Sequence, residues 1–120
     1  MVLSKQRRIF SSNISTLIKW AIDQGYEVTI GEVLRTKEQQ EIYVKEGKSQ
    51  TMNSMHLLGL ATDLNLFVNG VYSTDPIQYK ILGDKWGTLN PKNRWGGDFN
   101  KDGEIDTKFC DYDHFEMTNT

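Results

Sequence analysis

The spacing of apolar residues changes along the chain from helical to alternating, which predicts a mixture of helices and strands. Over residues 4–24 apolar side chains recur at helical spacing, and Gly25 is a natural residue to end that helix. Apolar and polar residues then alternate over Tyr26–Leu34, where β-forming residues are common, so a strand is predicted there. Thr36-Lys-Glu-Gln39 has the form of a capping box and predicts a short helix that ends at Gly47.

The second half of the chain adds three strands, a hairpin turn and a helix. Asn69-Gly70 is a strong signal for a two-residue hairpin turn. Asp75-Pro76 is a good helix start, because aspartate caps a helix and proline fits its first turn. The predicted elements are, in order, a strand at Leu60–Val68, a short strand at Val71-Tyr72, a helix from Asp75 to about Gly87, a loop at Asn90–Asp106 and a strand at His114–Met117.

These elements predict an α+β fold with a small, mostly antiparallel sheet flanked by helices, because they lack a regular strand–helix–strand rhythm. At 120 residues the chain is long enough for one hydrophobic core, and no linker or repeat divides it. In the strand at Leu60–Val68, Leu64 and Leu66 share one face and Asp63 lies on the other. If the leucines pack against helices, Asp63 points into a groove on the opposite face.

Charge and composition exclude several classes of function. A net charge of −2 and an isoelectric point near 5.6 argue against a nucleic-acid partner, which needs a concentrated basic face. No apolar run approaches the ~18–20 residues of a membrane span, and the N-terminal residues lack the apolar core of a signal peptide. We therefore expect a monomer that is made in the cytoplasm and has no membrane partner. Cys110 is the only cysteine, so no internal disulfide is expected, and a small buried thiol is its simplest interpretation.

The chain has two histidines, and both lie in phrases suited to holding a metal. His56 lies in Ser54-Met-His56-Leu-Leu-Gly59-Leu-Ala61-Thr-Asp63, and His114 lies in Asp111-Tyr-Asp-His114-Phe-Glu116. A lone histidine is more often a surface or core residue than a ligand, but here both have suitable acidic partners. Gly59 can adopt a positive φ, which lets the chain turn so that His56 and Asp63 converge. Two imidazoles and one carboxylate leave a fourth position open for water, as in catalytic zinc sites.

The same phrases resemble a known family. Ser-x-His-x-x-Gly-x-Ala-x-Asp, a later Trp95-Gly96-Gly97-Asp98 segment and Asp-x-x-His-x-Glu are similar to those of the zinc peptidases that cleave peptidoglycan stem peptides. That group includes D-alanyl-D-alanine carboxypeptidases and dipeptidases and the phage L-alanyl-D-glutamate endopeptidases, and the chain resembles the phage endolysins most. The resemblance spans about residues 35–116 and implies that residues 1–120 form a single zinc peptidase catalytic domain, with zinc in a groove on the sheet.

The resemblance also implies roles for individual residues. It makes His56, Asp63 and His114 the zinc ligands, Asp111 the general base, Arg35 a group that stabilises the oxyanion and binds substrate, and Ser54 a substrate-binding residue. The chemistry agrees, since a carboxylate can accept the proton of the attacking water and an arginine can face the developing negative charge. For Arg35 a surface salt bridge remains the alternative. We rank Asp111 above Asp113 and Glu116 as the base. On an extended segment Glu116 shares a face with His114 and is instead suited to orient its imidazole.

A second metal phrase follows the tryptophan–glycine segment. Its oxygen-bearing side chains have the spacing of positions 1, 3, 5 and 9 of an EF-hand loop, with Gly103 at position 6 and an aliphatic residue at position 8. The candidate calcium ligands are Asp98, Asn100, Asp102, Glu104 and Asp106. Position 12 should be a bidentate glutamate and is Phe109. Two interpretations stay open: a polar turn, or a calcium loop completed by a residue elsewhere that orders the zinc site.

We therefore predict a zinc-dependent endopeptidase that cleaves peptidoglycan stem peptides at the L-alanyl-D-glutamate bond. As a phage endolysin it would act on the cell wall after a separate membrane-permeabilising protein releases it. One alternative from the same family is a D-alanyl-D-alanine carboxypeptidase or dipeptidase. A second alternative is a zinc-containing binding domain on the same scaffold that does not hydrolyse its ligand.

Overall fold

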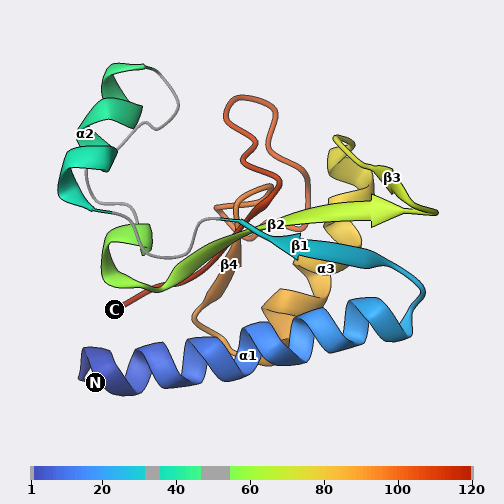
Figure 1. Cartoon of the computed structure of the whole chain (residues 1–120), viewed down its shortest axis with the longest axis horizontal. Helices are drawn as coiled ribbons and strands as arrows, with labels where there is room; N and C mark the ends of the chain where they lie inside the picture. Colours follow the sequence, from blue (N-terminus) through green and yellow to red (C-terminus); the bar gives the residue numbers. More distant parts are fainter. Residues whose placement is uncertain (1, 32–35, 47–54, 120) are drawn as a thin grey trace.

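The computed structural model describes residues 2–31, 36–46 and 55–119. Within these residues helices and strands alternate irregularly along the chain (Figure 1). The elements are α1 (Leu3–Asp23), β1 (Glu27–Ile30), α2 (Lys37–Lys45), the 3₁₀ turn η1 (Met55–Leu58), β2 (Ala61–Val68), β3 (Val71–Tyr72), α3 (Pro76–Leu89), β4 (Asn93–Trp95) and β5 (His114–Met117). None of the helices in this part of the chain is long and apolar enough to cross a membrane.

The strands form one sheet in which every pair is antiparallel. The order is β1-β2-β5-β4, and the short β3 pairs with the far end of β2. The central position of β2 follows from its length of eight residues, because it pairs with β1 and β3 at one end and with β5 at the other. The predicted α+β class with a small antiparallel sheet is confirmed.

Helices α1 and α3 cover one face of this sheet. In Figure 1, α1 runs beneath the strands, and the long connection from β4 to β5 rises on the other side. The core between helices and sheet contains Phe10, Leu17 and Ala21 of α1, Tyr79, Leu82 and Trp86 of α3, and Leu64, Leu66, Phe115 and Met117 of the strands. Leu64 and Leu66 are buried, whereas Asp63 and Asn65, which alternate with them, are only partly covered. The prediction that Leu64 and Leu66 lie on the core face of β2 and Asp63 on the opposite face is therefore confirmed.

The local signals for turns and helix starts are borne out. The Gln39 N–H donates to the Thr36 hydroxyl oxygen at 3.1 Å and caps α2. The Ile77 N–H donates to the Asp75 carboxylate at 2.9 Å at the start of α3. Asn69 and Gly70 both have positive φ angles, 53° and 77°, as a type I′ hairpin turn requires.

The structure differs from the sequence prediction at several element ends and by one additional strand. β1 ends at Ile30, whereas the predicted strand continues to Leu34. Residues 32–34 of that predicted strand lie outside the described part of the chain. α3 continues two residues past Gly87, to Leu89. The segment predicted as a loop from Asn90 contains the strand β4 (Asn93–Trp95), because it pairs with β5 along an edge that its glycine-rich surroundings do not reveal. β4 carries Arg94, which contacts Glu116 of β5.

Trp95 is packed between two glycine backbones, which explains part of the tryptophan–glycine segment. A Cβ added at Gly83 of α3 would lie 2.3 Å from Trp95 Cδ2, and one added at Gly97 would lie 2.3 Å from Trp95 Cζ2. The indole N–H donates to the Tyr112 carbonyl oxygen at 2.7 Å. The segment therefore joins α3 to the connection that carries Asp111, as expected for a structural role.

Replacing Gly83 with Ala is expected to lower the free energy of unfolding by about 1–3 kcal/mol, because the new methyl group overlaps the indole of Trp95. Gly87→Ala in the same helix is the matched control, because no described atom lies within 4 Å of its added Cβ. That control should raise the stability by up to about 1 kcal/mol through helix propensity. Chemical denaturation measures both, and equal effects of the two changes would contradict this packing.

Candidate metal centre

The register of β2 and β5 brings two of the predicted ligands together. Asp63 and His114 are direct cross-strand partners, so their side chains lie on the same face of the sheet. The Leu64 N–H donates to the Asp113 carbonyl oxygen at 2.9 Å next to this pair. On the other side, the Gly31 N–H donates to the Asp63 carbonyl oxygen at 2.7 Å. Asp63 is therefore held by backbone contacts to both neighbouring segments.

His56 reaches the same face from the turn η1. Gly59 follows the turn with a φ of 70°, which is the positive value predicted from the sequence and one that L side chains rarely adopt. The Arg7 side chain of α1 donates from Nε to the Leu58 carbonyl oxygen at 2.7 Å. An added Cβ at Gly59 would lie 3.0 Å from Arg7 Nε. Helix α1 thus anchors the turn that presents His56.

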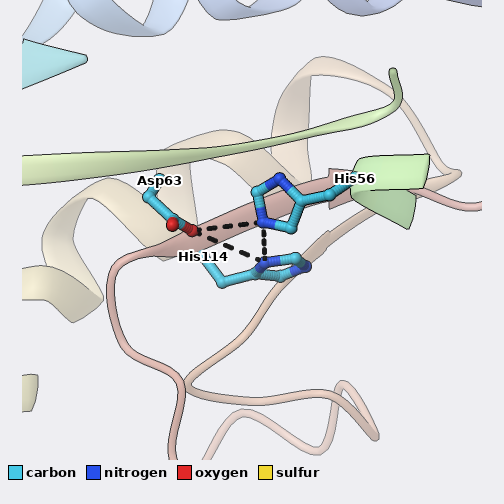
Figure 2. Close-up of side chains that lie close together, drawn as sticks. All are labelled: His56, Asp63 and His114. Atoms are coloured by element: carbon cyan, nitrogen blue, oxygen red, sulfur yellow. Dashed lines mark hydrogen bonds and ion pairs between the residues drawn. The ribbon is translucent and has the colours of Figure 1, made fainter. Parts of the chain in front are cut away.

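The three side chains converge on one point (Figure 2). His56 Nε2 lies 3.2 Å from His114 Nδ1 and 3.4 Å from Asp63 Oδ1, and His114 Nδ1 lies 3.7 Å from Asp63 Oδ1. Of the histidine, cysteine and acidic residues in the described ranges, these three form the one group of three or more whose ligand atoms all lie within 4.8 Å of each other. Tetrahedral zinc with bonds of about 2.0–2.1 Å places its ligand atoms about 3.3 Å apart. The residues therefore fit a zinc ion.

Burial and charge at the trio also favour a cation. Burial by itself raises the pKa of Asp63, but hydrogen bonds to His114 and His56 outweigh it and lower that pKa to about 2. Burial opposes protonation of His114, but hydrogen bonds to Asp63 and Glu116 raise its pKa to about 9. Without a metal, a proton on His114 therefore balances the Asp63 carboxylate. A divalent cation between these side chains would take the place of that proton.

Glu116 orients the His114 ring, as the alternation along β5 predicts. Its Oε1 lies 2.7 Å from His114 Nε2. An ionised carboxylate can only accept, so Nε2 carries the proton and the ring turns Nδ1 toward Asp63. Burial raises the pKa of Glu116, but the contacts with His114 and Arg94 lower it overall. Glu116 is therefore ionised and does not stand at the position of a base.

Asp111 lies beside the trio. Its Oδ2 is 3.7 Å from His114 Nδ1, and its side chain is 38% exposed, so one oxygen faces the ligands while the carboxylate stays open to solvent. Its backbone is fixed by Gly96, since the Asp111 N–H donates to the Gly96 carbonyl oxygen at 3.0 Å. A Cβ at Gly96 would meet the Asp111 carbonyl oxygen at 2.3 Å. The absence of a side chain at Gly96 lets the base candidate approach the strand.

Asp113 forms a carboxyl pair with Asp111. Burial, the charges of Asp63 and Asp111 and a hydrogen bond to Asp111 raise the pKa of Asp113 to about 7. A carboxyl with that pKa is protonated part of the time at neutral pH and can donate to Asp111. From the sequence, Asp113 was only an alternative base, because its pairing with Asp111 depends on the folded loop.

Two residues of the predicted site lie outside the described residues. These are Arg35 and Ser54, which fall in the ranges 32–35 and 47–54. Their predicted roles at the oxyanion and the substrate stay predictions.

The calcium-like loop has the turns of an EF-hand but does not gather its carboxylates. Asp98 Oδ2 accepts from the Gly103 N–H at 2.9 Å, and Gly103 has a φ of 85°. Asp106 Oδ2 accepts from the Phe99 N–H at 3.0 Å. The carboxylates thus bind backbone N–H groups of their own loop, and no three of the acidic residues in this described segment have ligand atoms within 4.8 Å of each other. Calcium binding by this loop stays a prediction.

Arg94 is a site residue that the sequence analysis missed. It lies in β4 directly across from Glu116, and Nη2 is 2.7 Å from Glu116 Oε2. No spacing in the sequence links the two residues, because the pairing of β4 with β5 depends on register. The sequence predicted only a loop over residues 90–106.

Taken together, a His/Asp/His trio that could hold one metal ion and a neighbouring aspartate lie on one face of an antiparallel sheet in an α+β protein. Sequence comparison narrows this description. The family model of phage L-alanyl-D-glutamate peptidases matches residues 4–118. The chain therefore belongs to the phage L-alanyl-D-glutamate peptidase family.

Individual relatives agree with this assignment. The chain is 41% identical over 81 residues to the L-alanyl-D-glutamate peptidase of Listeria phage A118, which covers 59% of this chain and 29% of that protein. The chain thus spans less than a third of the length of this relative. The fold is similar to that of the Serratia marcescens L-Ala D-Glu endopeptidase ChiX, with a TM-score of 0.58, 26% identity, and coverage of 77% of this chain and 67% of that one.

A second solved structure shares the fold at lower identity. It is the vancomycin resistance D,D-pentapeptidase VanY from a VanB-type resistance cassette, in complex with Zn(II). The TM-score is 0.57 at 20% identity, with coverage of 90% of this chain and 70% of that one. This likeness supports the fold.

Proposed function

We propose that this protein is a zinc peptidase that hydrolyses the L-alanyl-D-glutamate bond of peptidoglycan stem peptides. The observation that carries the proposal is the trio of His56, Asp63 and His114, whose ligand atoms lie 3.2–3.7 Å apart in a member of the phage L-alanyl-D-glutamate peptidase family. We assign these three residues as the zinc ligands. The zinc-bound VanY structure has the same fold and is consistent with that choice of metal.

The other residues have distinct roles in this proposal. Zinc held by His56, Asp63 and His114 would act as a Lewis acid on the scissile carbonyl and would lower the pKa of a bound water molecule to about 7. Asp111 takes the proton of the attacking water and passes it to the leaving amine of D-glutamate. The roles proposed for Arg35 and Ser54 come from the sequence resemblance: stabilisation of the developing oxyanion by Arg35 and binding of the substrate peptide by Ser54.

The choice of bond is tested by mass spectrometry of peptidoglycan digested with the purified protein. Cleavage between L-alanine and D-glutamate leaves peptides with a new N-terminal D-glutamate. Loss of terminal D-alanine would instead identify a D-alanyl-D-alanine carboxypeptidase. A protein that retains zinc and releases neither product would be a binding domain on the same scaffold.

The biological role follows from this activity. We propose that the protein acts as a phage endolysin on the host cell wall. Release of the protein to the wall by a separate membrane-permeabilising protein, and action as a monomer, belong to the same proposal.

We further propose that the loop from Asp98 to Asp106 binds calcium weakly and thereby orders the zinc site. Phe99 in this loop packs its ring against His114, with ring centroids 5.7 Å apart, so a change in the loop reaches a zinc ligand. Adding calcium to the zinc-loaded protein should then increase the rate of wall lysis. Asp102→Ala should remove the response, whereas Asp84→Ala, which removes an exposed aspartate paired with Lys80, should keep it. An unchanged rate over the calcium titration would contradict the proposal.

A further inference from the structure

Next to the proposed zinc site, two hydrogen bonds run from the guanidinium of Arg94 in β4 to the carboxylate of Glu116 in β5. We call this pair of hydrogen bonds the fork. Arg94 donates to Glu116 Oε2 from Nη2 at 2.7 Å and from Nε at 3.1 Å. The other oxygen, Oε1, accepts from His114 Nε2 at 2.7 Å. Each carboxylate oxygen thus has its own charged or polar partner, and the plane of the carboxylate is fixed from both sides.

Glu116 and His114 are both buried, so the loss of a hydrogen bond to Glu116 is not compensated by water. The Glu116 side chain is 5% exposed and that of His114 is 6% exposed, whereas the Arg94 side chain is 35% exposed. A buried carboxylate that loses its arginine is left with an unpaired oxygen and tends to move or to take up a proton. The backbone of Glu116 cannot follow easily, because its carbonyl oxygen accepts from the Trp86 indole N–H at 2.9 Å in the core. Loss of Arg94 would therefore displace the side chain of Glu116 rather than the strand.

Phe99 closes the remaining side of this arrangement. The Arg94 guanidinium lies over the Phe99 ring, 5.1 Å from its centroid. The same ring contacts His114. Glu116 and Phe99 thus both contact the imidazole of His114, and Arg94 contacts both of these residues.

We propose that Arg94 is a positioning residue for the metal centre, which acts through Glu116 to hold His114 with Nδ1 directed at Asp63 and His56. This inference rests on the proposed function in one respect, namely that these three residues bind zinc. Its physical basis is the fork geometry. Outer contacts of this kind set the orientation of a metal-binding imidazole and typically change metal affinity by ~10–100-fold.

The test measures zinc affinity without any substrate. Metal-free protein competes with a chromophoric chelator for zinc, and the visible absorption of the cobalt-substituted protein reports ligand geometry. Arg94→Gln should weaken zinc binding by about tenfold and Glu116→Gln by ~10–100-fold. The double variant should be no weaker than Glu116→Gln alone, since Arg94 acts only through that carboxylate. Arg94→Lys should recover part of the loss, because an ammonium group can still donate one bond to Oε2.

Two controls separate positioning from folding. Arg8→Gln removes an exposed arginine of α1 whose side chain donates to the Ser4 carbonyl oxygen in the same helix, and it should leave zinc affinity unchanged. Denaturation of each metal-free variant shows whether it is folded. If Arg94→Gln does not fold, the Arg94→Lys pair with and without Glu116→Gln provides the same comparison.

The outcomes distinguish this inference from the proposed function. Unchanged zinc affinity in Arg94→Gln, or an equal loss from that change in the presence and absence of Glu116, would overturn the role of Arg94 while leaving the peptidase proposal intact. The expected affinities together with intact stem peptides would instead overturn the peptidase proposal alone. A wild-type protein that binds no zinc would overturn both.

Discussion

Replacing Asp111 with Asn should lower kcat for wall hydrolysis by about 10²–10⁴-fold, the usual contribution of a general base. The amide has the size of the carboxylate but cannot accept the proton of the attacking water. Because Asp111 lies beside the His/Asp/His trio rather than within it, the zinc content should stay at that of the wild type. Rates of stem-peptide cleavage and metal analysis of the same samples measure the two quantities.

A second aspartate-to-asparagine variant serves as the control for the loss of a carboxylate. Asp84→Asn removes an exposed carboxylate of α3 that pairs with Lys80, and it should keep the full rate. If Asp111→Asn cleaves stem peptides at the wild-type rate, Asp111 is not the base. Asp113, which shares a hydrogen bond with Asp111, would then be the next residue to replace.

Replacing His56 with Gln should abolish both zinc binding and cleavage. His56 supplies one corner of the ligand triangle, with Nε2 3.2 Å and 3.4 Å from the other two ligand atoms. Without it, two ligands remain, and zinc affinity should fall by more than the ~100-fold that loss of an outer contact can cause. Metal analysis after dialysis and the cleavage assay measure the loss.

Thermal unfolding gives an independent reading of the same substitution. Zinc that binds only the folded protein adds about 2.7 kcal/mol of stability at ~100 times its Kd. The wild type should therefore show a higher Tm with zinc than without, and His56→Gln should show no such rise. A zinc-dependent rise in the variant equal to that of the wild type would remove His56 from the ligand set.

Much of the fold could be predicted because its signals are local. The helical spacing in α1 and the turn at Asn69-Gly70 depend on neighbours a few residues apart. The predicted strand at His114–Met117 has the bounds of β5. The strand β4 was not predicted, since three residues between a turn and two glycines carry too little pattern and gain their structure from pairing with β5.

In the candidate site, too, some residues could be predicted from the sequence and others could not. His56, Asp63 and His114 were found because their sequence phrases are distinctive, and the structure brings their ligand atoms together. The roles of Arg94 and Gly96 depend on cross-strand register and on close backbone approach. Neither cross-strand register nor close backbone approach can be read from the sequence, so the roles of Arg94 and Gly96 become visible only in the folded chain.

The most direct measurement is mass spectrometry of peptidoglycan treated with metal-free protein to which zinc is added stepwise. We expect peptides with a new N-terminal D-glutamate to be absent at first and to rise until about one equivalent of zinc per chain is bound, as a single site with three protein ligands requires. Full cleavage without zinc would contradict the zinc site. An uncut L-alanyl-D-glutamate bond in the zinc-saturated sample would contradict the proposed activity.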